Sequence, residues 1–290
     1  TNFLKGGRNT LYNQTANFSY TLPTSKFPLL DWTTVNLKYQ ASYRWIGASR
    51  LAVNLGNILE NGQRKEGTAQ LDFTRLYNKL KFFRAIDQPR VSGATRSVTT
   101  RTDTVFRYVT RDGIKVKEVK RLKIKKIRDK NAIPDVGTIG RIFGKLITSV
   151  KQVNVSLSEN ANTRLPGYTD SSQFVGQNWK SMAPGLDFVL GRQPDTTWLN
   201  NAARKGLITK DSMFSTILQQ SFDQRLTFTA QLEPVRDLTI SVNVSKTFNK
   251  NYSELFKDTT GTGNNFGHLS PYAGGGFDVS YIAYKTLFGK

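Results

Sequence analysis

Within one stretch of 14 residues, apolar and polar side chains alternate without a break from Val35 to Trp45. In Thr33–Ile46, the odd positions from 35 to 45 are apolar or aromatic, whereas the even positions between them are polar or charged. Successive side chains of a β-strand point to opposite faces, so this period of two predicts a strand with one apolar and one polar face. A tilted strand of about 9–11 residues crosses a bilayer, so this strand is long enough to span one.

The same alternation recurs along most of the chain and predicts roughly ten strands in an up-and-down order. Asn61-Gly62 is the commonest short hairpin signal, and Leu165-Pro166-Gly167-Tyr168 has the composition of a turn. The further strands are predicted at Tyr12–Leu22, Leu51–Leu59, Thr68–Thr74, Gln152–Glu159, Ala183–Gly191, Phe222–Leu232, Leu238–Phe248 and Phe277–Phe288.

Three segments do not follow this alternation. In Arg75–Ile86, apolar residues recur every three or four positions, which predicts a short amphipathic helix with basic residues beside it. Pro194–Arg204 predicts another helix, with Asp195 or Thr196 as its N-terminal cap. The Gly-, Asn- and Thr-rich stretch Asp258–Gly276 predicts a long loop that carries His268 as a solvated residue without a partner.

Residues 90–130 are polar, rich in Thr and then intensely basic. Arg111–Lys130 contains ten Lys or Arg and three Asp or Glu, and its apolar residues fit neither the strand nor the helix period. We predict a basic polar insertion, either a solvated hairpin or a partly disordered segment. A site for acidic partners or nucleic acid is the alternative, but the absence of Phe, Tyr and Trp from Arg111–Lys130 argues against base stacking.

Strand length favours a membrane barrel over a soluble sandwich, whose strands rarely reach about 11–14 residues. We therefore predict an all-β fold, the antiparallel wall of a transmembrane β-barrel, with short helices and long loops between strands. Polarity assigns the faces of Thr33–Ile46. The lumen-facing residues are predicted to be Asn36, Lys38, Gln40, Ser42 and Arg44. The lipid-facing residues are predicted to be Val35, Leu37, Tyr39, Tyr43 and Trp45.

Composition narrows the chemistry that this chain of 290 residues supports. There is no cysteine and a single histidine, so disulfides, thiol chemistry and most His-based catalysis or metal binding are excluded. The net charge of +21 favours contact with anionic lipid, nucleic acid or acidic protein segments. No stretch approaches the roughly 18 consecutive apolar residues of a transmembrane helix. The chain begins without Met or a secretory signal, as expected of a mature chain or of a piece of a longer one.

No motif in the sequence predicts an enzyme, a cofactor site or a metal site. Gly140 and Gly144 are separated by three residues where a P-loop needs four, and Leu146 stands where Ser or Thr would bind magnesium. This segment instead predicts a short helix or the entry into the next strand. A catalytic triad would depend on His268, which lacks an obvious partner in the sequence.

Several blocks, in order along the chain, carry a family resemblance. They are Tyr20–Pro23, Lys26–Leu29, Asp31-Trp32, Leu71–Lys79, Leu165–Tyr168, Ala183–Gly191, Glu233–Leu238 and Asn251–Phe256. On these blocks the chain resembles the SprA (Sov) family, the giant outer-membrane translocons of the type IX secretion system of Bacteroidetes. The resemblance runs from about Tyr20 to Phe256 and leaves out the basic insertion.

The resemblance implies that residues 1–290 are a segment of one transmembrane β-barrel domain, an arc of a very large barrel in the bacterial outer membrane. It implies a protein-conducting channel that exports folded proteins, including gliding-motility adhesins, without catalysis. The implied partners are outer-membrane lipid, a PorV-type barrel protein, a periplasmic plug protein and secreted cargo, with no nucleic acid and no cofactor.

Three other classes remain open at the level of sequence. One is a different outer-membrane barrel, such as a TonB-dependent receptor or porin, which would show a plug domain or a closing strand. Another is a soluble basic β-protein that binds nucleic acid, which would bind DNA in a salt-dependent way. The last is a barrel hydrolase, which would need a catalytic role for His268.

Overall fold

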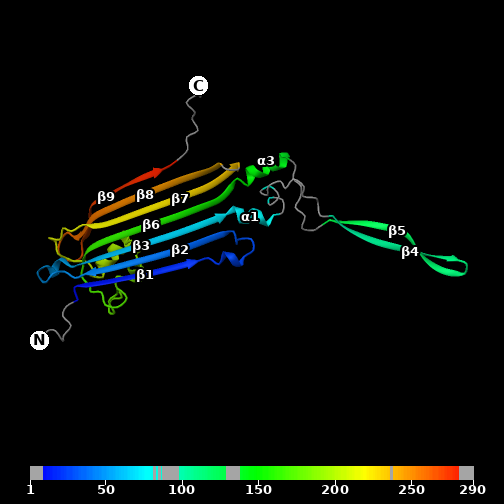
Figure 1. Ribbon diagram of the computed structural model, residues 1–290. Helices are drawn as coiled ribbons and strands as arrows, with labels where there is room; N and C mark the ends of the chain where they lie inside the picture. Colours follow the sequence, from blue (N-terminus) through cyan, green and yellow to red (C-terminus); the bar gives the residue numbers. More distant parts are fainter. Residues whose placement is uncertain are drawn as a thin grey trace, which may run out of the picture. The chain divides into compact units, whose positions relative to one another are not determined.

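The computed structural model describes residues 9–80, 83, 86, 98–128, 138–235 and 238–280 (Figure 1). The chain divides into two compact units, one of residues 1–72, 152–232 and 240–290, the other of residues 73–151 and 233–239. The strands are β1 (Leu11–Thr21), β2 (Thr33–Ile46), β3 (Asn57–Asp72), β4 (Val98–Arg111), β5 (Ile114–Arg128), β6 (Val150–Tyr168), β7 (Leu218–Val235), β8 (Leu238–Asp258) and β9 (Phe266–Val279). The helices are α1 (Phe73–Lys79), α3 (Thr138–Ile147), α4 (Leu186–Val189) and α5 (Thr196–Arg204), with short 3-10 turns at Thr24–Lys26 and Arg50–Leu55.

Seven strands form one sheet in the order β1-β2-β3-β6-β7-β8-β9, as Figure 1 shows. The pairs β1/β2, β2/β3, β3/β6 and β8/β9 are antiparallel. The predicted all-β antiparallel fold is therefore confirmed. Within the described residues, β1 and β9 are the two edges of an open sheet, and no closed barrel is formed.

The predicted strand bounds are right where the alternation is unbroken. The structure gives β2 the bounds Thr33–Ile46, as the pattern predicts. The prediction of a hairpin at Asn61-Gly62 is wrong, because both residues lie inside the single strand β3. Gly62 is used there for its missing side chain, since a Cβ would lie 2.7 Å from Asn162 Oδ1 and 2.8 Å from Ser42 Oγ.

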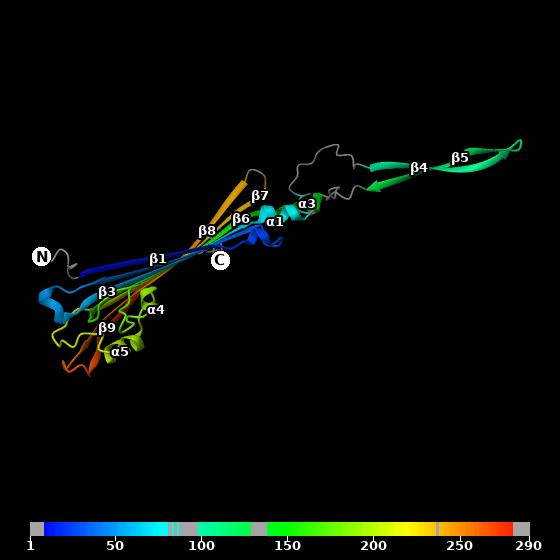
Figure 2. The same cartoon turned by 90° about the horizontal axis from the view of Figure 1, so that it is seen from below.

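Residues 169–217, which connect β6 to β7, form a covering segment over one face of the sheet. Figure 2 shows its helices α4 and α5 on one side of the strands. The main hydrophobic core lies between this segment and the sheet, and includes Tyr43, Leu59, Leu165, Phe188 and Leu199. The core therefore occupies one end of the strands and leaves the rest of the sheet's surface open.

Four further predictions are wrong, and one extends beyond the described residues. The predicted strand Leu51–Leu59 begins in the 3-10 turn Arg50–Leu55, and β3 starts only at Asn57. Ala183–Gly191 is not a strand but contains α4, and Leu165–Tyr168 is the end of β6 and not a turn. The predicted loop Asp258–Gly276 is mostly β9, so His268 is a strand residue. The predicted strand Phe277–Phe288 overlaps β9 only to Val279, and its part from residue 281 lies outside the described residues.

The second unit contains the basic insertion, of which residues 90–97 and 129–130 lie outside the described residues. Residues 98–128 form the predicted hairpin, β4 paired with β5 in a separate sheet. Asp112 (φ 50°) and Gly113 (φ 75°) make its turn, in the conformation that a type I′ hairpin requires. A register shift at Val105/Phe106 marks a β-bulge in this hairpin.

Two short helices belong to the same unit. The helix predicted at Arg75–Ile86 begins as α1 at Phe73, and residues 81–82 and 84–85 of the prediction lie outside the described residues. The Tyr77 hydroxyl donates to the Ile147 carbonyl at the end of α3 (3.1 Å), so α1 and α3 are neighbours. Burial raises the pKa of the Tyr77 phenol above its usual value.

Candidate functional site

The polar face of the sheet gathers all the residues predicted to line a lumen. Asn36, Lys38, Gln40, Ser42 and Arg44 lie opposite Thr21, Ser19, Asn17, Thr15 and Asn13 of β1. On the other side they lie opposite Thr68, Glu66, Arg64, Gly62 and Glu60 of β3, and these in turn lie opposite Ser156, Ser158, Asn160, Asn162 and Arg164 of β6. Across four strands this face therefore carries no apolar side chain in these rows, and water can solvate all of it.

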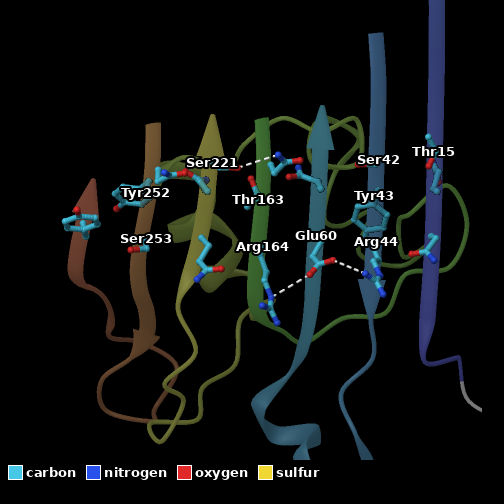
Figure 3. Close-up of a pocket in the computed structure, with 18 residues that line it drawn as sticks. Thr15, Ser42, Tyr43, Arg44, Glu60, Thr163, Arg164, Ser221, Tyr252 and Ser253 are labelled. Atoms are coloured by element: carbon cyan, nitrogen blue, oxygen red, sulfur yellow. Dashed lines mark hydrogen bonds and ion pairs between the residues drawn. The ribbon is translucent and has the colours of Figure 1, made fainter. Parts of the chain in front are cut away.

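A hollow of about 890 Å³ lies on the sheet at the end that bears the covering segment. At its centre, Glu60 accepts from Arg44 (3.5 Å) and faces Arg164 (3.7 Å), as Figure 3 shows. Amides and hydroxyls line much of the rest, among them Asn13, Asn162, Gln219, Ser221, Asn251 and Ser253. The charged side chains are a third to a half exposed, so each ion pair contributes little to stability.

The hollow offers hydrogen bonds and one excess positive charge. Its single carboxylate, Glu60, lies between the guanidinium groups of Arg44 and Arg164. In the described part of the chain, no group of three or more His, Asp or Glu is placed to hold a metal ion. The sequence predicted Arg44 on this face but not Glu60 or Arg164. These two residues lie side by side because of the register between β3 and β6, which the sequence pattern does not reveal.

The residues predicted to face lipid are divided between two environments. Val35 and Leu37 lie on the open part of the apolar face, where Leu37 is 47% exposed, whereas the Tyr39 hydroxyl donates to the Leu190 carbonyl of the covering segment. Tyr43 and Trp45 are only 2% and 3% exposed, because the covering segment packs over them. The prediction that Tyr43 and Trp45 face lipid is therefore wrong: periodicity assigns a side chain to a face but not to what covers that face.

The covering segment is attached to the strands by specific hydrogen bonds. The Tyr43 hydroxyl bonds Ser172 Oγ (2.5 Å), and the Trp45 indole donates to the Asp170 carbonyl (3.0 Å). Asn61 Nδ2 donates to the carbonyls of Phe188 (2.7 Å) and Arg192 (2.9 Å). These bonds satisfy polar groups that the core would otherwise bury at a cost, and they fix the segment in one position.

Aromatic packing supports the same attachment. The Phe188 ring meets Tyr43 edge-on (6.2 Å between centroids) and stacks on Trp198 of α5 (5.2 Å). Asp195 caps α5 by accepting from the Trp198 amide (2.7 Å), so the cap predicted from sequence is confirmed. The covering segment is thus a packed part of its unit, held at one end of the sheet.

Beyond the covered end, the apolar face carries an open band of large apolar side chains, here called the apolar band. Tyr20 lies opposite Leu37, and Leu37 lies opposite Gly67, which faces Leu157 on β6. The Gln224 amide donates to Glu159 (2.8 Å), which places the even positions of β7 on this same face. The exposed members of the band are Phe18, Tyr20, Leu37, Leu157, Leu226, Ile240 and Phe277, between 37% and 61% exposed.

His268 has a partner that its sequence neighbourhood does not reveal. Its Nδ1 lies 2.8 Å from Glu254 Oε2, and the Glu254 side chain is 1% exposed. The ring also packs on Phe256, with centroids 4.7 Å apart. The prediction of a solvated loop histidine is therefore wrong, and the pair joins β8 to β9.

No model of a known protein family and no curated protein matches this chain. Within the described residues, no helix is long and apolar enough to cross a membrane.

Proposed function

We propose that this chain forms part of the wall of a protein-conducting channel in the bacterial outer membrane, of the kind used for type IX secretion. One observation carries the proposal: a single sheet has one face that is polar across its rows and an opposite face with an exposed apolar band. A soluble sheet buries its apolar face, whereas a membrane barrel turns that face to lipid and its polar face to the lumen.

The height of the open part of this face fits a bilayer. On β2 it runs from Thr33 to the start of the covered end at Ala41, which is roughly 27 Å at about 3.4 Å per residue. Within it, the row of Tyr39 also carries Lys65 and Glu159. Outer-membrane barrels carry an apolar band about 25 Å tall. The long strands β6, β7 and β8, of 19, 18 and 21 residues, exceed this height, so their covered end would lie beyond the membrane.

The open edges of the sheet support an arc and not a small closed barrel. Within the described residues, β1 and β9 each have one neighbour in this sheet, and their outer edges present backbone groups without strand partners. Lipid cannot satisfy such groups, so in a membrane these edges must pair with further strands. The order of the sequence blocks that resemble the SprA (Sov) family supports the same proposal.

A passive mechanism follows from this arrangement. Lys38, Gln40 and Arg44 present charges and amides to the lumen, where they hold water and give folded cargo no apolar surface to bind. The channel would do no catalysis and need no cofactor, and energy for export would come from elsewhere. A PorV-type barrel protein would receive cargo, and a periplasmic plug protein would close the pore.

The test is the intact mass of the polypeptide that carries this sequence, recovered from outer membranes of its source cells in detergent. A mass far above the 32.6 kDa of this chain would support a large translocon. A mass of 32.6 kDa, or recovery in the soluble fraction without detergent, would contradict it.

A further inference from the structure

The short helix α3 carries its apolar side chains on the outside. Its large apolar residues, spaced as one helical stripe, are 59–72% exposed: Ile139, Ile142, Phe143, Leu146 and Ile147. A helix on the surface of a soluble protein buries such a stripe against the core. The orientation of α3 is therefore the reverse of what packing within this unit would require.

The side of α3 that carries a small residue, Gly144, is the side that packs inward. Gly144 is buried, and a Cβ at this position would overlap the Ile86 side chain, which is itself 1% exposed. The glycine lets α3 approach Ile86 closely, while the bond from Tyr77 to the Ile147 carbonyl holds its end. The apolar stripe thus faces outward because the other side of the helix is already in contact.

Charge indicates what covers the stripe. The helices α1 and α3 together contain four basic residues, Arg75, Lys79, Arg141 and Lys145, and no acidic residue. The hairpin of the same unit, residues 98–128, holds eleven Lys or Arg and three Asp or Glu. An apolar stripe within so basic a unit fits the surface of a lipid bilayer in which apolar acyl chains lie below negatively charged headgroups.

We propose that α3 is an interfacial helix that lies in the headgroup region of an anionic lipid leaflet. The ten residues of α3 reach only about 15 Å, too short to span a bilayer but suited to lie along it. Its stripe enters the boundary between headgroups and acyl chains, and Lys145 with the basic hairpin contacts lipid phosphates. This binding is separate from the proposed wall, since either is possible without the other.

Because the chain has no cysteine, single labels test the proposal directly. The full chain carries Phe143→Cys with an environment-sensitive fluorophore, in vesicles of phosphatidylcholine alone or mixed equally with phosphatidylglycerol. We expect nitroxide at the lipid headgroup to quench position 143 several-fold more in the mixed vesicles. This additional quenching in the mixed vesicles should disappear at about 1 M salt, where the electrostatic screening length falls to about 3 Å.

Two further labels separate the outcomes. A label at Leu37→Cys tests the proposed wall, because nitroxide at the bilayer centre should quench it. A label at Thr110→Cys reports on an exposed polar position of the hairpin. Quenching of position 143 by aqueous iodide in both vesicles would overturn the proposal. Protection from iodide and lipid quenchers alike would also overturn it, since another part of the protein would then cover α3. Equal lipid quenching with and without phosphatidylglycerol would overturn the preference for anionic lipid.

Discussion

At the scale of single residues, Gly191 lets the covering segment sit close to the sheet, and Gly62 makes room on the opposite, polar face of the sheet. Gly191 has φ +93°, and a Cβ on it would lie 2.5 Å from the Gly62 carbonyl oxygen. Gly62 has no side chain to hold Ser42 and Asn162 apart. The sequence Asn61-Gly62 resembles a hairpin turn because the turn and the close approach require the same residue, and only the tertiary structure distinguishes them.

We expect Gly191→Ala to destabilise the unit more than Gly206→Ala does. Gly206 also has positive φ (+70°) but has open space where a Cβ would be, so its replacement costs about 1 kcal/mol of backbone strain. Gly191→Ala adds steric overlap with β3, for an additional ~1–3 kcal/mol. Denaturant unfolding in detergent, followed by Trp fluorescence, measures the difference. Equal losses in the two variants would show that the segment does not contact the sheet as described.

His268 and Glu254 give a second residue-scale prediction. Glu254→Ala removes the partner of His268 and leaves a cavity at a buried site, whereas Glu254→Gln keeps an acceptor for the ring. We expect the Ala variant to lose roughly 1–3 kcal/mol and the Gln variant less. Unfolding of both variants checks this. An unchanged midpoint for Glu254→Ala would argue that the pair does not join β8 to β9.

At the scale of elements, the sequence predicted those that depend on local signals. The bounds of β2 follow from its unbroken alternation, and α5 follows from its cap and apolar spacing. Ala183–Gly191 was misassigned because its apolar run is short, and such a run fits a buried helix as well as a strand. β9 was missed because its glycines resemble a loop, although pairing with β8 holds them extended.

The cap of α5 provides a prediction at this scale. Asp195→Ala should cost about 1 kcal/mol, because the Trp198 amide loses its acceptor. Asp195→Asn keeps a side-chain oxygen and serves as the matched control. Since Trp198 stacks on Phe188, the Ala variant should also loosen the covering segment, measured as faster amide hydrogen exchange in residues 186–204. Exchange that matches the wild type would contradict this coupling.

At the scale of the whole molecule, the sequence predicted two faces but not how the apolar one is divided. The polar residues of β2 share a face with polar residues on both neighbouring strands, as their period requires. The burial of Tyr43 and Trp45 depends on a segment more than a hundred residues away, and no local pattern records it. The open edges and the hollow around Glu60 likewise depend on strand order and register.

The polar face leads to a prediction about export. Replacing Lys38, Gln40 and Ser42 together by Leu should impede secretion of folded cargo, since the lumen would gain apolar surface. Replacing the same residues by Thr keeps the face hydrated and should leave secretion near the wild-type level. Secreted cargo in the medium is compared with the amount of channel in the outer membrane. Normal secretion by the Leu variant with normal channel levels would count against a lumenal face.

The central claim is that one face of β2 contacts lipid and its opposite face contacts water. The most direct measurement compares Leu37→Cys and Gln40→Cys labels, three residues apart on opposite faces of β2, in the full protein reconstituted into vesicles. The account predicts that nitroxide at the bilayer centre quenches the label at position 37, whereas aqueous iodide quenches the label at position 40. If iodide quenched both labels equally and lipid nitroxide quenched neither, the sheet would not be a membrane wall.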